Sequence, residues 1–293
     1  MSDHKAPCDE WIEMNGKKDS IGIIAGGGQF PILAAESAKK QGFHVVAVAH
    51  EGDTDPALAD VADKIIWVKL GQLGKIISVF KKEGIKKALM AGSISKGNMF
   101  RARPDLKGIA LISRLAILHD DGILRAVALD LAKEGIEIVD STHYLPDLIA
   151  PEGCLTKKRP DRAMEEDIRL GWKVAKEMGR LDVGQCVVIR NRTVLALEAI
   201  DGTNETIKRG GQIAGRDAVV VKVSKPDQDL RFDVPSAGLE TIEVMAGVKA
   251  SVLAVEAEKT LLFDRQKMIE LADRAGISIV CYRGEELIEK GQG

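Results

Sequence analysis

The sequence predicts an α/β protein of two domains, the first built on a parallel sheet. Three observations support this. Short aliphatic runs alternate with amphipathic stretches from Ser20 to about Val139, which is typical of parallel strands joined by helical crossovers. The first aliphatic run leads directly into three glycines, Gly26–Gly28. Three prolines between residues 141 and 160 then break any long element, and a different pattern follows.

These features divide the chain into three parts. We expect a flexible N-terminal tail over residues 1–19, which are polar and charged. A Rossmann-like domain is expected over residues 20–150, and a C-terminal α/β domain over residues 151–293.

The expected strands of the first domain are aliphatic and lack polar alternation, as strands buried on both faces of a sheet require. They cover residues 21–25, 44–49, 65–68, 87–91 and 137–139. The expected helices are amphipathic, and glycines at 42 and 84 end two of them. They cover residues 32–41, 55–62, 71–82, 108–118 and 122–133.

The second domain begins with one long expected helix over residues 162–178. Two apolar runs, residues 185–190 and 194–198, then flank Asn191-Arg192-Thr193 and predict a β-hairpin. Helices and strands alternate after the hairpin. Helices are expected over residues 205–213, 239–246 and 265–275, and strands over residues 218–223, 251–255 and 277–281, with a short apolar run at 260–263.

Composition excludes several classes of protein. The net charge of -2 and the aromatic content of 4% argue against a nucleic-acid binder, which needs clustered cations and stacking rings. Four scattered cysteines without a CxxC pair indicate free thiols in a reducing compartment. The chain contains no apolar run of membrane-spanning length, so we expect a soluble cytoplasmic protein.

The glycine turn predicts a phosphate-bearing ligand. Glycines between a strand and a helix let the backbone approach an anion, and the helix N-terminus adds a partial positive charge. The substrate-binding candidates here are Gly26, Gly27, Gly28 and Gln29. Pro31 stands where the last glycine of the dinucleotide fingerprint GxGxxG would be, so a nicotinamide cofactor is disfavoured. A tight turn without a ligand is the structural alternative.

A second turn follows the fourth expected strand. Its candidates are Ala91, Gly92 and Ser93. The carboxyl ends of parallel strands face one crevice, so this turn is expected to line the same site as the glycine turn. The alternative is an ordinary strand-to-helix turn that binds no ligand.

Polar residues gather at the ends of the two hairpin strands. Gln185 precedes the first, and Glu198, Asp201, Gly202 and Thr203 follow the second. The carboxylates of Glu198 and Asp201 could bind a hard cation such as Mg²⁺. Alternatively, Asp201-Gly202 is a simple turn and Thr203 is a helix N-cap.

A third polar segment contains Lys225, Arg231 and Asp233. The two cations are natural phosphate partners. Asp233 lies between apolar residues in a short segment that ends at Pro235. It is either a structural carboxylate with its hydrogen bonds satisfied, or a metal ligand or base.

Taken together, five motifs resemble one family, the UDP-2,3-diacylglucosamine pyrophosphatases of the LpxI type, which act in lipid A synthesis. The motifs are IGIIAGGGQFP, LMAGSISK, GRLDVGQCVVI, VLALEAIDGTNETI and VSKPDQDLRFDVPSAGLETIE. The resemblance covers the chain from Ser20 to Tyr282, and the motifs of the second half are the specific ones.

The resemblance implies a two-domain enzyme with its substrate between the domains. It implies Mg²⁺-dependent hydrolysis to UMP and 2,3-diacylglucosamine 1-phosphate (lipid X), catalysed by Asp233 with Lys225 stabilising the phosphates. It also implies transient contact with the inner membrane, and we expect a homodimer. Two other readings remain open, a nicotinamide-dependent oxidoreductase and a non-catalytic protein that binds a nucleotide sugar or lipid.

Overall fold

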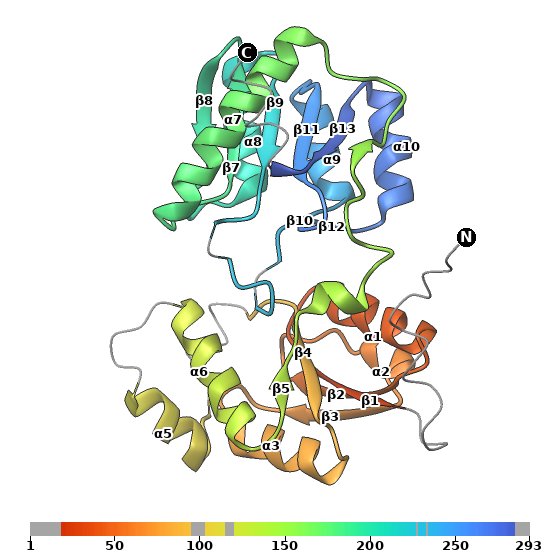
Figure 1. The fold of residues 1–293 in the computed structure, drawn as a ribbon, viewed down its shortest axis with the longest axis vertical. Helices are drawn as coiled ribbons and strands as arrows, with labels where there is room; N and C mark the ends of the chain where they lie inside the picture. The colour runs from red at the N-terminus through yellow and green to blue at the C-terminus, as the bar shows by residue number, and fades with distance from the viewer. Residues whose placement is uncertain (1–18, 95–102, 115–119, 227, 233, 285–293) are drawn as a thin grey trace, which may run out of the picture. The chain divides into compact units, whose positions relative to one another are not determined.

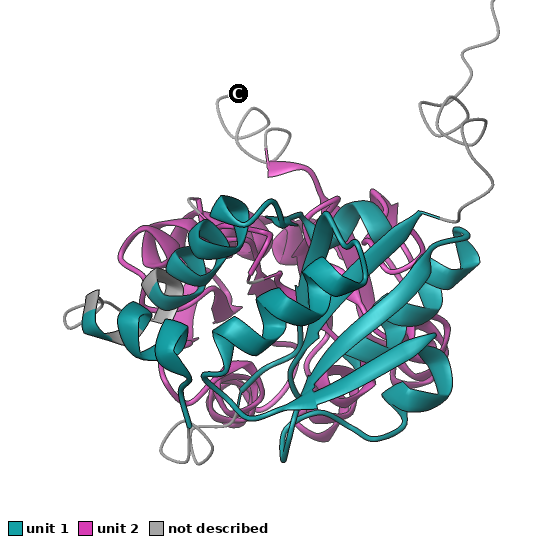
Figure 2. Ribbon diagram, turned by 90° about the horizontal axis from the view of Figure 1, so that it is seen from below, with its two compact units in different colours: residues 1–144 teal, residues 145–293 magenta. Residues whose placement is uncertain are grey.

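The chain forms two compact units, residues 1–144 and residues 145–293 (Figure 2). The computed structural model describes residues 19–94, 103–114, 120–226, 228–232 and 234–284. The expected tail and Asp233 lie outside these ranges. The expected domain boundary at residue 150 falls a few residues beyond the division after Tyr144.

Unit 1 is built on a five-stranded parallel sheet with the order β3-β2-β1-β4-β5 (Figure 1). Its strands are β1 (Ser20–Ala25), β2 (His44–His50), β3 (Lys64–Val68), β4 (Lys87–Ala91) and β5 (Glu137–Ile138). The central strand β1 is buried from Ile21 to Ala25, which explains why its sequence is aliphatic throughout. The predicted parallel sheet is thus confirmed.

Helices cover the unit 1 sheet, with α1 and α2 above it and α3 below it in Figure 1. They are α1 (Phe30–Lys40), α2 (Leu58–Val61), α3 (Leu73–Lys82), α5 (Leu106–Arg114), α6 (Asp120–Lys133) and the 3₁₀ helix η2 (Ser141–Tyr144). Pro31 lies in the first turn of α1, where a missing N–H is tolerated. Gly42 follows α1 with φ +89°, a conformation that favours glycine.

Unit 2 contains a six-stranded mixed sheet with the order β6-β13-β11-β9-β7-β8. Strands β9, β11 and β13 are parallel, whereas β7 runs antiparallel to β9. The strands are β6 (Gly153–Cys154), β7 (Cys186–Arg190), β8 (Thr193–Leu197), β9 (Val219–Lys222), β11 (Val252–Glu256) and β13 (Ser278–Tyr282). The amino end of β7 therefore lies at the same edge as the carboxyl ends of β9 and β11.

Each face of the unit 2 sheet is covered by helices. Trp172 and Ile168 of α7 pack on one face against Val187 and Val221. The other face packs against the remaining three helices. The helices are α7 (Arg162–Arg180), α8 (Thr203–Ala214), α9 (Leu239–Gly247) and α10 (Arg265–Ala275). This helix–sheet–helix layering confirms the predicted second α/β domain.

Three very short strands complete unit 2. β6 is the edge strand of the six-stranded sheet and pairs with β13, and β10 (Ser236–Ala237) pairs with β12 (Leu261–Leu262). The sequence analysis did not expect β6 or β10, because two residues carry no periodic signal.

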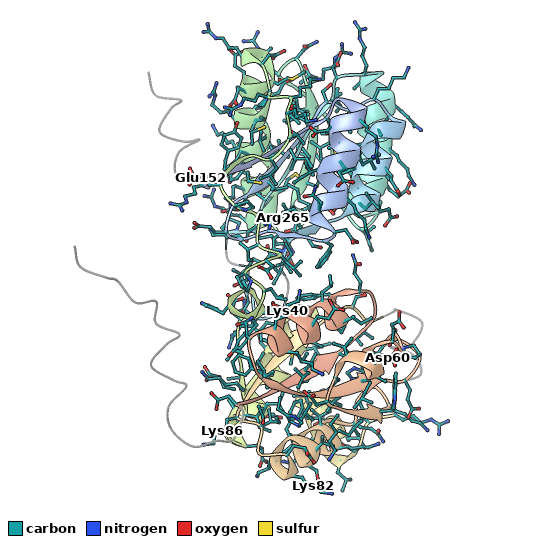
Figure 3. All side chains as sticks on the ribbon, turned by 90° about the vertical axis from the view of Figure 1, so that its right-hand side faces the viewer. Lys40, Asp60, Lys82, Lys86, Glu152 and Arg265 are labelled. Atoms are coloured by element: carbon teal, nitrogen blue, oxygen red, sulfur yellow. The ribbon has the colours of Figure 1, made fainter. Side chains whose placement is uncertain are left out.

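Charged side chains lie on the surface of both units. Figure 3 shows Lys40, Lys82 and Lys86 on unit 1 and Glu152 on unit 2, all exposed. Within the described part of the chain, every helix is too short or too polar to cross a membrane.

The β7–β8 hairpin depends on a buried carboxylate of α7. Asn191 and Arg192 form the turn with φ of 50° and 58°, the left-handed conformation of a tight hairpin. Their amides donate to Asp167, at 2.9 Å from Oδ2 for Asn191 and 2.5 Å from Oδ1 for Arg192. The Asp167 side chain is only 5% exposed. It thus stabilises a backbone conformation that non-glycine residues adopt at a cost.

We predict that Asp167→Ala lowers the free energy of unfolding by about 1–3 kcal/mol, since two amides lose a charged acceptor. The measurement is chemical denaturation of the full chain. The control is Glu166→Ala, which removes an adjacent carboxylate whose ion pairs to Arg162 and Arg192 are long, 3.9 Å each. Equal stability of the two variants would contradict the prediction.

Candidate functional site

The two predicted turns of unit 1 lie together. The Gly26 amide donates to the Ala91 carbonyl at 2.8 Å, and the Gly27 amide donates to the Ser93 carbonyl at 2.6 Å. Ser93 returns a bond from its amide to the Gly27 carbonyl at 3.1 Å, which makes a small antiparallel bridge. The two turns are therefore adjacent in unit 1, and that they line one binding site stays a prediction.

Two of these glycines are required by the close approach of the turns. A Cβ on Gly26 would lie 2.5 Å from the Ser93 carbonyl oxygen, and one on Gly92 would lie 2.4 Å from that of Gly27. Gly28 differs, since it has φ +84° and open space beside it. The amides of Gly26 and Gly27 therefore donate hydrogen bonds within the protein. The part of the glycine turn with open space beside it is Gly28.

The carbonyl of Ala25, at the end of β1, is held by two side chains from β2 and the loop after it. His50 Nδ1 lies 2.9 Å from this oxygen and Thr54 Oγ1 donates to it at 2.7 Å. Because a carbonyl only accepts, Nδ1 of His50 carries the proton in this contact. His50 is 6% exposed, and burial lowers its pKa below the usual 6.5 against the raising effects of Ala25 and Asp53.

In unit 2 the polar residues at the hairpin ends meet as expected. Glu198 is 8% exposed. It accepts from the Thr203 hydroxyl at 2.7 Å and from the Gln185 amide at 3.0 Å. One carboxylate therefore joins the start of β7 to the start of α8. The alternative that Thr203 is an N-cap is wrong, because Gly202 occupies that position with φ 80° and Thr203 begins the helix.

Asp201 also has partners within unit 2. Its Oδ2 lies 2.9 Å from Arg209 Nη2, and its Oδ1 accepts from the Ala199 amide at 3.1 Å. The bond from Arg209 is the largest cause of its lowered pKa. Asp201 is thus an ionised carboxylate that closes the turn between β8 and α8.

The motif GRLDVGQ is shaped by two close contacts. A Cβ on Gly179 would lie 3.1 Å from Lys225 Cα, and one on Gly184 would lie 2.3 Å from the Glu198 carbonyl oxygen. Between these glycines, Asp182 forms an ion pair of 2.5 Å with Lys225 Nζ. The loop after α7 therefore brings the Lys225 segment and the Glu198 turn together.

The segment that carries Lys225 and Asp233 joins β9 to β10. Asp233 lies outside the described residues, so its contacts are not part of this geometry. Arg231, a predicted phosphate partner, forms a bidentate pair with Asp229 at 2.8 and 2.7 Å. The sequence analysis missed three buried or partly buried residues that contact this segment. They are Lys176, Lys222 and Glu256.

Opposite charges flank the buried Cys186 at the start of β7. The pKa of its thiol is raised to about 12, mainly by burial and in addition by Glu198, whereas Lys222 acts to lower it. The charges of Glu198 and Lys222 are therefore both close enough to act on one sulfur atom. The thiol itself is protonated and unreactive at neutral pH.

The described residues do not form a ready metal centre. No three side chains of His, Cys, Asp or Glu gather within the ranges that the structure describes. Both oxygens of Glu198 and both of Asp201 already accept hydrogen bonds. Each of these oxygens keeps a second lone pair, so either carboxylate could still bind a cation, but the two alone do not make a preformed magnesium site.

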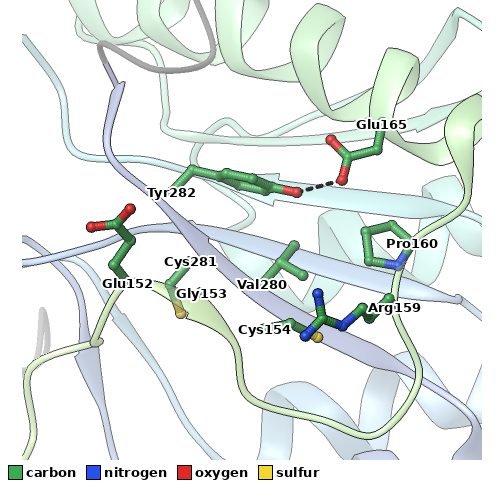
Figure 4. Close-up of a pocket in the computed structure, with 9 residues that line it drawn as sticks. All are labelled: Glu152, Gly153, Cys154, Arg159, Pro160, Glu165, Val280, Cys281 and Tyr282. Carbon is green, nitrogen blue, oxygen red and sulfur yellow. Dashed lines mark hydrogen bonds between the residues drawn. The ribbon is translucent and has the colours of Figure 1, made fainter.

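A cavity of about 390 Å³ lies at the edge of the unit 2 sheet, between β6, β13 and the start of α7 (Figure 4). Tyr282 donates across it to Glu165 Oε1 at 2.6 Å. Arg159 is also in its lining, whereas none of the predicted site residues is. Beside it, the Lys157 backbone amide donates to Asp273 Oδ1 and the Lys158 ammonium donates to the Gly276 carbonyl, so these two residues are fixed to the end of α10.

Two family descriptions match the chain. The LpxI N-terminal domain matches residues 20–148, and the LpxI C-terminal domain matches residues 151–280. The UDP-2,3-diacylglucosamine pyrophosphatase LpxI of Caulobacter vibrioides is 31% identical over 276 residues. That alignment covers 89% of this chain and 96% of the relative.

Solved structures resemble the chain only loosely. N5-carboxyaminoimidazole synthetase from Staphylococcus aureus complexed with ADP has 16% identity and a TM-score of 0.29, covering 60% of this chain and 34% of that one. Biotin carboxylase from Campylobacter jejuni has 13% identity and a TM-score of 0.28, covering 79% and 42%. These scores are too low to support an argument.

We predict that His50 makes unit 1 less stable in mild acid. Its pKa is lowered in the folded protein, so below about pH 6.5 the unfolded chain binds a proton that the folded chain does not. Stability is therefore lost as the pH falls from about 6.5 towards the folded pKa. Each pKa unit of lowering is worth about 1.4 kcal/mol, or roughly 3 °C in Tm for a unit of this size.

The measurement is calorimetric Tm at pH 7 and pH 5. His50→Asn retains a donor near Ala25 without a titrating ring, so it should lose less Tm between these pH values than the unchanged protein. His143→Asn, at an exposed histidine, is the control. The same acid sensitivity in all three proteins would refute the role of His50.

Proposed function

The chain belongs to the LpxI family, and we propose that it hydrolyses the pyrophosphate of UDP-2,3-diacylglucosamine in lipid A biosynthesis. The products are UMP and 2,3-diacylglucosamine 1-phosphate. The observation that carries the proposal is the similarity to the Caulobacter enzyme, which extends over 89% of this chain. The similarity therefore extends through both units, whereas a shared nucleotide-binding turn alone would give a match to a small part of the chain.

The local geometry of unit 2 supports this chemistry. Hydrolysis of a pyrophosphate requires neutralisation of the phosphoryl oxygens and alignment of a water molecule. Lys225 is the proposed phosphate partner, and its present partner Asp182 is an exposed carboxylate that a phosphate can replace. Asp233, eight residues further along the same segment, is the proposed catalytic residue that orients the water.

Other residues of unit 2 are proposed to bind the substrate. The side-chain oxygen of Gln185 is buried and accepts no hydrogen bond from the described residues, so it can accept one from a ligand. Gly202 and Thr203 begin α8, where backbone amides favour an anion. In unit 1 the proposed contacts are Gly26, Gly27, Gly28, Gln29, Ala91, Gly92 and Ser93.

We also propose that the reaction needs Mg²⁺, with Asp233, Glu198 and Asp201 as the available carboxylates. A bound magnesium ion would neutralise charge on the phosphoryl oxygens. Glu198 and Asp201 would hold the ion with oxygens that also accept hydrogen bonds from the protein. What the chain itself supplies is the charge of Lys225 and the carboxylate of Asp233.

The acyl chains of the substrate require an apolar surface. Leu181, Val183 and Ile200 are large apolar residues that are 77%, 50% and 91% exposed. They flank the contact between Gly184 and Glu198, so they lie beside the proposed phosphate site. We propose that the protein is cytoplasmic, that this surface meets the inner membrane transiently, and that the active form is a homodimer.

We predict that Asp233→Asn keeps the fold and reduces UMP release from UDP-2,3-diacylglucosamine by about 10²–10⁴-fold. This is the usual contribution of a positioned acid or base. The measurement is UMP release under saturating substrate, with circular dichroism as the check on folding.

The matched control for Asp233→Asn is Glu240→Gln, which neutralises an exposed acid in the first turn of α9. It should turn over at the normal rate. Near-normal turnover in Asp233→Asn would remove this residue from the mechanism.

We predict that excess EDTA abolishes UMP release and that added Mg²⁺ restores it. If Glu198 binds the ion, Glu198→Gln should raise the Mg²⁺ concentration for half-maximal rate by about 10-fold or more. Glu205→Gln is the control, since Glu205 is exposed and pairs only locally with Lys208. Undiminished activity in EDTA would contradict the requirement for a metal.

A further inference from the structure

The segment between β9 and β10 runs from Lys222 to Ser236 and contains Lys225 and Asp233. Its described residues between these two strand positions, 223–226, 228–232 and 234–235, are turns and irregular backbone. Backbone bonds to neighbouring strands reach its ends, from the Val223 amide to the Gln185 carbonyl at 3.1 Å and from the Leu261 amide to the Pro235 carbonyl at 2.8 Å, and do not fix the described residues between them. Other groups must hold the segment if the residues it carries are to meet a substrate in one geometry.

The first end of the segment is held by an ion pair between the partly buried Lys176 and the buried Glu256, whose side chains are 20% and 3% exposed. Lys176 of α7 donates from Nζ to the Ser224 carbonyl at 2.7 Å and to Glu256 Oε2 at 2.6 Å. The same Glu256 oxygen accepts from the Ser224 amide at 2.9 Å. Both backbone polar groups of Ser224 are thus bound by one pair of opposite charges.

Glu256 is the last residue of β11, and this position places its carboxylate beside Ser224. It is 2% exposed, and its second oxygen accepts from Lys259 at 3.0 Å. The ammonium of Lys176 also lies 5.9 Å from the ring centroid of Trp172, which favours a cation. Every oxygen of the buried carboxylate therefore has a charged donor.

The other end of the segment is held by Lys222, the last residue of β9. Its Nζ donates to the Ser236 carbonyl at 2.7 Å, and the residue is 8% exposed. Ser236 begins β10, so this one bond closes a loop of 14 residues in sequence separation. The start of β10 is thereby tied to the carboxyl end of β9.

We propose that Lys176 and Lys222 are positioning residues that hold the Lys222–Ser236 segment, and with it Lys225 and Asp233, in the reactive geometry. This inference rests on the proposed function. Buried ion pairs add little to stability because desolvation offsets their attraction. What such a lysine contributes is geometry, because one ammonium group can donate to two or three acceptors at once and so fixes their relative positions.

The single variant Lys222→Met tests the second anchor. Methionine keeps the apolar stem and removes the donor to Ser236. We expect kcat to fall by roughly 10- to 100-fold with KM within about threefold, as a misplaced catalytic group produces. Thermal unfolding and circular dichroism check that the variant is folded.

The first anchor requires a double variant. Lys176→Met alone leaves Glu256 buried beside fewer donors and is expected to lower stability. Lys176→Met with Glu256→Gln removes both charges, so stability should return while kcat stays low, because Ser224 still lacks its donor. The control is Lys173→Met, an exposed lysine one turn earlier on α7, which should leave kcat unchanged.

Hydrogen exchange separates this inference from the proposed function. Amides of residues 224–236 should exchange at least about 10-fold faster in Lys222→Met and in the double variant, but not in Lys173→Met. If the unchanged protein does not release UMP, the proposed function fails and the exchange rates still test the anchors. Unchanged exchange in both anchor variants, or folded variants with kcat within twofold of normal, would overturn the inference.

Discussion

Where the chain passes the carboxyl end of a buried strand, its backbone N–H and C=O groups have no partner in the sheet and need hydrogen bonds from elsewhere. This requirement shapes both units. In unit 1 the carbonyl of Ala25 is bound by His50 and Thr54. In unit 2 the amide and carbonyl of Ser224 are bound by Glu256 and Lys176. A buried peptide group without a partner loses the free energy of a hydrogen bond, so each strand end is accompanied by a polar side chain. The loops that these side chains hold are those that carry the proposed site residues.

Much of this architecture can be predicted from the sequence, because periodicity and glycine placement are local signals. The aliphatic runs identified the parallel strands of unit 1, and Gly26 and Gly92 marked turns that contact each other. The anchors carry no such signal. Lys176 lies within an amphipathic helix where a lysine is usually solvated, and its role depends on Glu256, 80 residues away in sequence. The two-residue strands β6 and β10 exist only because edge partners are present.

The candidate site shows the same division between local and long-range information. The sequence predicted that Gln185, Glu198 and Thr203 gather, because a hairpin brings its strand ends together. It misplaced the helix start, since Gly202 with its positive φ provides the N-cap and frees the Thr203 hydroxyl to bind Glu198. Only the contacts in the folded protein distinguish a carboxylate that stabilises a turn from one that binds a cation.

This distinction bears on where a metal would bind. Glu198 and Lys222 both act electrostatically on Cys186, so the field of one is partly cancelled by the other at the start of β7. The Thr203 hydroxyl and the Gln185 amide each use one lone pair of Glu198 and fix how this carboxylate is oriented at the starts of α8 and β7. A cation at Glu198 would therefore meet an oriented carboxylate, but also the opposing charge of Lys222. Asp233 belongs in sequence to the Lys222–Ser236 segment, whose two ends are held by Lys176 and Lys222. We therefore expect any cation that assists the reaction to depend on this anchored segment as well as on Glu198.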